Sequence, residues 1–128
     1  MAQDRESGAK ASLWGKSTAS AIVKALGATI PTGASNESEF EGRRVVIKCA
    51  AKTTDSVGVT YRMLDRIDAV LGAFQIDEVT FDILGLTLTQ FRENIRPTRS
   101  RSASAGKVGL VRRTIFQSQG RLIRRIQL

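Results

Sequence analysis

The last forty residues of the chain combine positive charge with hydroxyl groups. Residues 89–128 hold ten Lys/Arg and one acid, Glu93, a net charge of 10 − 1 = +9, whereas residues 1–88 hold ten Lys/Arg and eleven Asp/Glu, a net charge of 10 − 11 = −1. Nine of the ten C-terminal cations are arginines, whose planar guanidinium matches phosphate and guanine edges better than an ammonium does. The segregated charge predicts contact with a polyanion, and we expect nucleic acid, with DNA favoured over RNA.

Residues 96–107, RPTRSRSASAGK, alternate cations with serine and threonine and contain no large apolar residue. Cations and hydroxyls are the groups that donate to phosphate and sugar oxygens, so this segment is predicted to be a basic arm. Phe116 is the one aromatic residue after the arm, which favours contact with a duplex or a backbone over base stacking. The alternative interpretation is an exposed linker. The predicted nucleic-acid-binding residues are Arg96, Arg99, Arg101, Lys107, Arg112, Arg113, Arg124 and Arg125.

A second set of residues has the types needed for phosphodiester cleavage. Glu39 and Glu41 precede Lys48 by a short distance in the sequence. A carboxylate can hold Mg²⁺, and a nearby lysine can orient water or neutralise developing charge. The alternative is that Lys48 is a structural cation paired with a nearby glutamate.

The segment EFEGRRVVIK, residues 39–48, resembles the second-to-third-strand region of the PD-(D/E)XK nuclease superfamily, to which restriction endonucleases belong. The surrounding order over residues 17–85 is similar too: a helix, a strand ending in hydrophobic-x-Lys, a polar turn, a long helix and another strand. The resemblance implies Lys48 as the catalytic lysine and Glu39 or Glu41 as the first Mg²⁺-binding acid. The second acid would fall at Val46, which cannot bind metal, so Asp65 or Asp68 would have to replace it. Otherwise the resemblance implies a nuclease-like fold that binds nucleic acid without cutting it.

Several chemistries are excluded by composition. The chain has no histidine, which rules out a Ser-His-Asp triad, a Cys-His dyad and histidine metal sites. Cys49 is the single cysteine, so no internal disulfide forms, and intracellular residence is the simplest interpretation. No stretch approaches a membrane span, and the polar N-terminus lacks a signal-peptide pattern. A cytoplasmic protein without a membrane partner is therefore expected.

The elements that must position these residues follow from periodicity and turn signals. Helical spacing of Met63, Ile67, Val70 and Phe74 predicts a long amphipathic helix over 59–74. The other expected elements are a helix over 18–27 capped by Ser17-Thr18, a central strand over 45–50, a strand over 79–84, a brief helix capped by Thr87 or Thr89, and strands over 108–116 and 122–128 that form a hairpin.

These elements predict a mixed α/β or α+β fold with a single small sheet flanked by helices, a basic arm and a C-terminal β-hairpin. The expected organisation is a flexible lead-in over 1–16, a core over 17–95, and the arm and hairpin over 96–128. Three functions follow as hypotheses: a nucleic-acid-binding protein, a Mg²⁺-dependent nuclease, or an assembly protein that docks to RNA or an acidic partner. Self-association is left open.

Overall fold

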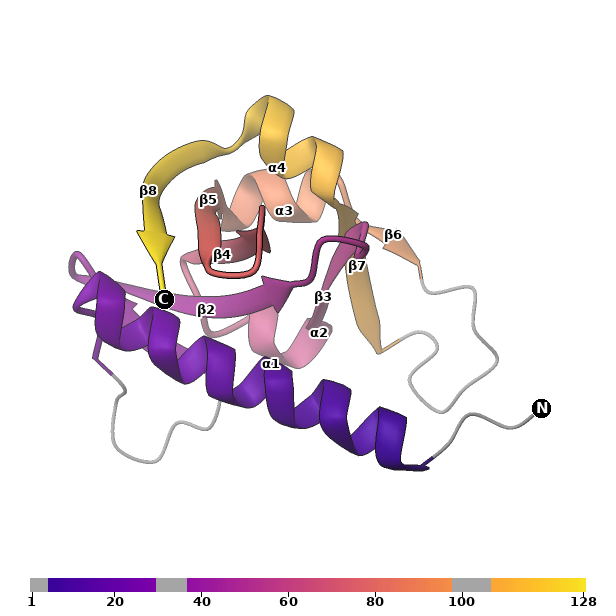
Figure 1. Cartoon of the computed structure of the whole chain (residues 1–128). Coiled ribbons are helices and arrows are strands. Elements are labelled where there is room, and N and C mark those ends of the chain that lie inside the picture. Colours follow the sequence, from indigo (N-terminus) through magenta and orange to yellow (C-terminus); the bar gives the residue numbers. More distant parts are fainter. Residues whose placement is uncertain (1–4, 30–36, 98–106) are drawn as a thin grey trace.

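The computed structural model describes residues 5–29, 37–97 and 107–128, and these form a mixed α+β fold with two sheets (Figure 1). The predicted fold class is confirmed, but the single expected sheet is replaced by two. The helices are α1 (Arg5–Leu26), α2 (Tyr61–Leu64), α3 (Leu88–Glu93) and α4 (Arg113–Gln119). The strands are β1 (Glu37–Phe40), β2 (Arg43–Ala50), β3 (Ser56–Thr60), β4 (Ala69–Gln75), β5 (Thr80–Thr87), β6 (Arg96–Pro97), β7 (Val108–Arg112) and β8 (Arg121–Gln127).

The larger sheet has five strands in the order β1-β2-β4-β5-β8. All neighbouring pairs are antiparallel except β2 and β4, which run parallel. The predicted strand over 45–50 is confirmed within β2, and the predicted strand over 79–84 corresponds to β5. Three further strands, in the order β3-β7-β6, form a smaller antiparallel sheet.

The prediction of a helix over 59–74 is wrong. The segment contains the end of β3, the single turn α2 and nearly all of β4. Six of the seven residues of β4 are buried, because this strand lies inside the sheet with both faces covered. A strand covered on both faces carries a continuous apolar run, and such a run also satisfies helical spacing. The long helix that formed part of the resemblance to the nuclease superfamily is therefore absent.

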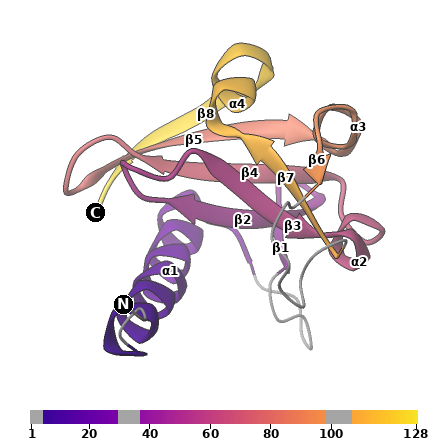
Figure 2. The ribbon, with the colours of Figure 1, turned by 90° about the vertical axis from the view of Figure 1, so that its right-hand side faces the viewer.

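Each face of the larger sheet has its own hydrophobic core. On one face, Ile22 and Leu26 of α1 pack against residues such as Ile47, Leu71 and Ile83. On the other face, the smaller sheet and the three short helices enclose a core that includes the fully buried Phe91 and Phe116. Figures 1 and 2 show α1 on one side of the larger sheet, with the smaller sheet, α3 and α4 on the other.

The predicted C-terminal hairpin is also wrong. β7 pairs with β3 and β6 in the smaller sheet, whereas β8 pairs with β5 at the edge of the larger one. The residues between them form α4 instead of a turn, and Phe116 anchors this helix in the core. The C-terminal segment consequently contributes a strand to each sheet.

The first helix is longer than the sequence predicts. α1 begins at Arg5, within the expected lead-in, and Ser17 lies inside it with its hydroxyl donating to the carbonyl of Trp14. The predicted end of this helix near residue 27 is confirmed: Gly27 follows the helix with a φ of 73°, its N–H donates to Lys24 O, and Ala28 N–H donates to Val23 O. These two bonds are those of a Schellman motif. Among the described residues, no helix combines the length and apolar character needed to cross a membrane.

The turn between β1 and β2 places a non-glycine residue in the left-handed region. Glu41 and Gly42 form the two-residue loop, with φ of 53° and 76°. Positive φ at both loop residues is the signature of a type I′ turn, which prefers Asn-Gly. A glutamate is disfavoured there because its Cβ crowds the backbone.

Replacing Glu41 with asparagine is therefore expected to stabilise the protein, by about 0.5–1 kcal/mol, because asparagine tolerates this conformation. Chemical denaturation in urea measures the change. Glu41→Gln is the matched control, since it also removes the carboxylate but keeps a disfavoured side chain in the turn. Equal stability of the Asn and Gln variants would contradict the assignment of strain to this position.

Candidate nucleic-acid interface

Exposed cations lie at one end of the smaller sheet, close to Pro97 and Lys107, the described residues on either side of residues 98–106. β6 ends at Pro97 and β7 begins at Val108, and the pairing of Arg96 with Leu110 holds these strands side by side (Figure 2). Arg96 and Lys107 are both exposed. Neither side chain forms a hydrogen bond or ion pair with another residue in the described ranges, so their charges are available to a ligand.

Two residues of α2 join this end of the sheet. The backbone N–H of Tyr61 donates to the carbonyl oxygen of Lys107 at 2.9 Å. Tyr61 is 37% exposed, and the adjacent Arg62 is exposed without an ion pair to any residue that the structure describes. We call Arg62, Arg96, Lys107 and Tyr61 the arm-base cluster. Its three cations have no acidic partner among the described residues, and they lie with Tyr61 near the end of β6 and the beginning of β7.

Arg112 lies at the opposite end of β7. It is exposed and pairs in register with Ser56 of β3. Four residue steps separate it from Val108, which corresponds to roughly 13 Å along a strand. Arg112 is thus a separate cation on the same sheet. Arg99 and Arg101, predicted to bind nucleic acid, lie outside the described residues.

Arg113 is held inside the molecule by three interactions. Its guanidinium donates to the carbonyls of Ala51 and Lys52 at 2.8 and 3.0 Å, and it lies over the ring of Phe74 at 5.1 Å. These contacts tie the start of α4 to the end of β2. The guanidinium of Arg113 therefore stabilises the contact between α4 and β2. It is less accessible to a ligand than the sequence suggests.

The two predicted cations of β8 also have intramolecular partners. Arg125 binds both carboxylate oxygens of Asp82 on β5, at 2.7 and 3.1 Å. Arg124 donates to the carbonyl oxygen of Ala25 near the end of α1, at 3.2 Å. Both side chains link β8 to its neighbours in the fold.

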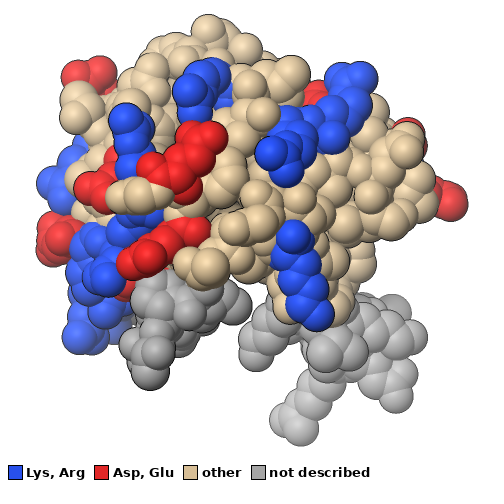
Figure 3. Space-filling view, turned by 90° about the vertical axis from the view of Figure 1, so that its left-hand side faces the viewer, with Lys and Arg blue, Asp and Glu red and all other residues tan. Residues whose placement is uncertain are grey.

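The surface that includes the edges of the larger sheet carries mixed charge. Figure 3 shows acidic side chains lying among basic ones on one part of this face, with uncharged surface separating the remaining basic side chains. Two more arginines of the C-terminal third have acidic partners, Arg92 with Asp65 at 3.0 Å and Arg121 with Glu41 at 3.7 Å. Among the described cations of residues 89–128, those whose side chains have no partner in the described residues are Arg96, Lys107 and Arg112, which lie on the smaller sheet or directly before β7.

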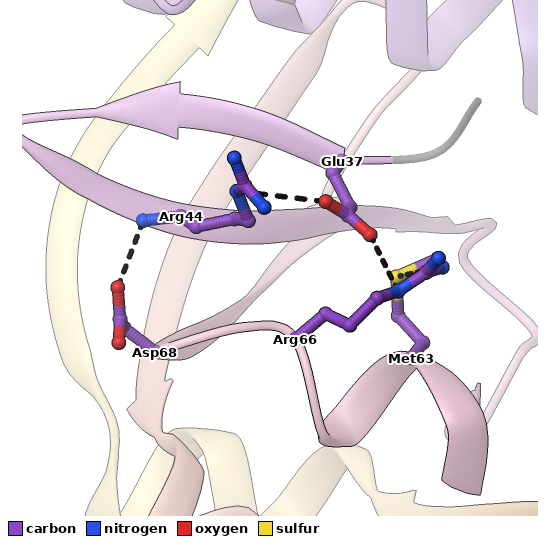
Figure 4. Close-up of polar contacts among 5 residues, drawn as sticks. All are labelled: Glu37, Arg44, Met63, Arg66 and Asp68. Atoms are coloured by element: carbon purple, nitrogen blue, oxygen red, sulfur yellow. Dashed lines mark hydrogen bonds and ion pairs between the residues drawn. The ribbon is translucent and has the colours of Figure 1, made fainter. Parts of the chain in front are cut away.

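A buried carboxylate, Glu37, lies at the centre of a separate charged cluster (Figure 4). Its side chain is only 6% exposed and accepts from Arg66 Nε at 2.9 Å, with Arg44 Nε at 3.5 Å. Asp68 fixes Arg44 by accepting from its backbone N–H at 3.0 Å. Each oxygen of Glu37 therefore faces a guanidinium, and the cluster joins β1, β2 and the segment that leads into β4.

The residues predicted for a nuclease site are spread over the fold. Glu39 pairs in register with Arg44, four residues and roughly 13 Å along β2 from Lys48. Glu41 lies in the turn beyond, and Asp65 follows α2, where it pairs with Arg92. Lys48 projects on the same face of β2 as Val46, the register partner of Glu37. The acid nearest to Lys48 in register is thus Glu37.

Mg²⁺ does not fit these residues. No group of three or more potential ligands occurs within the described parts of the chain, and the oxygens of Glu37 already face Arg44 and Arg66. Magnesium requires several oxygen ligands in near-octahedral geometry. The predicted metal ligands Glu39 and Glu41 do not supply such a set with Lys48.

Lys48 and its neighbour Cys49 are both half-buried in β2. Burial lowers the pKa of the Lys48 ammonium, and the nearby Cys49 thiol partly offsets this effect. Burial raises the pKa of Cys49 to about 11. Lys48 forms no ion pair with a described residue, so the structural alternative of a lysine–glutamate pair has no partner there. Its ammonium is a desolvated charge in the middle of the sheet.

Replacing Lys48 with methionine is expected to raise the free energy of unfolding by about 1 kcal/mol, because an apolar chain of similar length avoids the desolvation. In the original protein the unfolded state binds the proton more tightly. Lys48 should consequently contribute a rise in stability as pH increases through the window just below the ordinary lysine pKa of 10.5, whereas the raised pKa of Cys49 contributes a fall in both proteins, so the stability difference between the variant and the original protein should shrink in that window. Urea denaturation at pH 7 and at alkaline pH measures both effects. Lys52→Met, at an exposed lysine beyond the same strand, is the control, and equal changes in both variants would refute this explanation.

Tyr61 and Arg62 of the arm-base cluster and the burial of Glu37 were not predicted from the sequence. The first two were expected within a long helix, and no local pattern marks Glu37 as more buried than Glu39 or Glu41. The resemblance to the nuclease superfamily stays a prediction. Comparison of the chain with protein-family models, curated proteins and solved structures gives no match.

Proposed function

We propose that this protein binds nucleic acid by its phosphate backbone, using the arm-base cluster together with Arg99 and Arg101 of the intervening sequence. The observation that carries the proposal is the position of Arg62, Arg96 and Lys107, which are exposed and have no acidic partner among the described residues. Arginine and lysine at such positions release counterions from a polyanion when they bind it. The smaller sheet is the binding platform.

Tyr61 adds a contact that the sequence did not predict. Tyr61 is partly exposed and its backbone is hydrogen-bonded to that of Lys107, and an exposed aromatic face near cations can stack on an unpaired base. The phosphate contacts nevertheless provide most of the affinity, because the cluster holds three cations and a single aromatic residue. Binding should be tolerant of sequence, since phosphate contacts by the three cations of the cluster carry no information about the bases.

Replacing Arg62, Arg96 and Lys107 together with glutamine should weaken binding and reduce the slope of log affinity against log salt by about 3 on duplex DNA. Fluorescence anisotropy with a labelled duplex, measured across a salt series, gives both quantities. The charge-preserving variant Arg96→Lys with Lys107→Arg should retain the slope.

The control for general loss of charge is Arg92→Gln with Arg125→Gln, because both arginines already face carboxylates. This double variant should change the slope by less than about 1. A triple arm-base variant whose slope equals that of the original protein would reject the proposed surface.

The nuclease hypothesis gives a different outcome in a direct assay. Because the described acids do not converge on Lys48, we expect supercoiled plasmid to remain intact when incubated with the protein and Mg²⁺. Gel electrophoresis over a time course measures nicking. Mg²⁺-dependent cleavage that disappears in a Lys48→Ala variant would restore the nuclease hypothesis and place its site on β2.

A further inference from the structure

A pocket of about 250 Å³ lies at the end of the larger sheet where the β1–β2 turn approaches the beginning of β8, and it shares no lining residue with the arm-base cluster. Its walls come from the β1–β2 turn, the beginnings of β4 and β8, the end of β5, and residues of α3 and α4. The volume corresponds to about eight waters, or an organic molecule of about ten heavy atoms. The nucleic-acid proposal does not use this site.

The pocket is apolar inside and charged at its rim. Side chains of Phe40, Val45, Leu71 and Ile123 contribute apolar walls. A Cβ added at Gly85 would lie 2.8 Å from Ile123 and 3.1 Å from Leu71, so the glycine lets these two side chains approach the strand. Apolar walls beside polar and charged groups can hold a small molecule that has both an apolar and a polar part.

The polar groups of α3 and α4 are held in place by hydrogen bonds. Gln90 and Thr87 form a capping box at the start of α3, and Gln90 Nε2 donates to the carbonyl of Gln119 at 3.2 Å. All three residues line the pocket. This wall is therefore held in place by hydrogen bonds within the protein.

The opposite rim is closed by an ion pair that spans the two edges of the sheet. Glu41 follows edge strand β1 and Arg121 begins edge strand β8, four strand spacings away in the sheet order. In a flat sheet this is about 19 Å, so curvature brings the two edges together. The pair is 3.7 Å long, and its side chains are 64% and 72% exposed, which makes it weak. A competing anion can separate it.

The net charge of the side chains at the rim favours an anionic ligand. Arg43 and Arg121 against Glu41 leave a net charge of 2 − 1 = +1 at the rim. Arg43 is exposed and forms no ion pair within the described residues, so it can bind a second anionic oxygen. Glu41 occupies a backbone conformation disfavoured for its side chain, and its carboxylate lies where the ligand anion would bind.

We propose that this pocket binds a small anionic amphiphile, with its apolar body against Val45, Leu71 and Ile123 and its carboxylate or phosphate on Arg121 and Arg43. Glu41 acts as an internal competitor that occupies Arg121 until the ligand arrives. Binding therefore exchanges one carboxylate for another anion on the same guanidinium and adds burial of apolar surface. The site is selective for molecules that have both parts.

The test is a titration of the full chain with octanoate and octyl phosphate, followed by the backbone amide resonances of the protein. Shifts should concentrate at Gly85, Arg121 and Ile123. 1-Octanol tests the apolar body alone and acetate the anion alone, and both should bind more weakly than octanoate by about fivefold or more. The stronger of the two eight-carbon anions identifies the head group.

Two variants should change affinity in opposite directions. Arg121→Gln removes an anion-binding charge and should weaken octanoate binding by about fivefold, whereas Glu41→Gln removes the competitor and should strengthen binding by about two- to fivefold. Arg112→Gln, at an exposed arginine outside the pocket, should leave the affinity unchanged. Equal affinity for octanol, shifts that lie elsewhere, or a loss of affinity in both rim variants would overturn the proposal.

Discussion

The parallel pairing of β2 with β4 is the constraint on which the rest of the structure depends. Two adjacent parallel strands require a connection that returns from the end of one to the beginning of the other. Such connections are usually helical, but here the chain forms β3 and α2 instead. β3 pairs with β7, and β7 pairs with β6, so the smaller sheet is built on the strand that this crossover supplies. The arm-base cluster exists because α2 and β7 meet at the end of β3.

The same topology decides which arginines remain free. Placing β8 next to β5 brings Arg125 to Asp82, and curving the sheet brings Arg121 to Glu41. The charge segregation seen along the sequence is thus partly cancelled in three dimensions, because C-terminal arginines meet acids of the first 88 residues. Segregation along a chain is weaker evidence for a binding surface than the absence of acidic partners after folding.

The sequence predicted the mixed fold class, β2, β5, the start of α3 and the end of α1, since each depends on local signals. β2 is a β-branched run, Thr87 with Gln90 forms a capping box, and Gly27 provides the left-handed residue that a Schellman motif requires. The errors at 59–74 and 108–128 have a different origin. In both segments the spacing of apolar residues fits more than one element, and long-range pairing decides between them.

Long-range pairing also separates the parts of the site that were predictable from those that were not. Positive charge at Arg96 and Lys107 follows from composition, whereas the contribution of Tyr61 needs the pairing of β3 with β7, some fifty residues apart in sequence. Glu37 is buried because Arg66, from the connection into β4, returns to neutralise it. A buried carboxylate needs such partners, since removing a charge from water without compensation is costly. The connection between β2 and β4 therefore decides which of Glu37, Glu39 and Glu41 is buried, although the three have similar neighbours in the sequence.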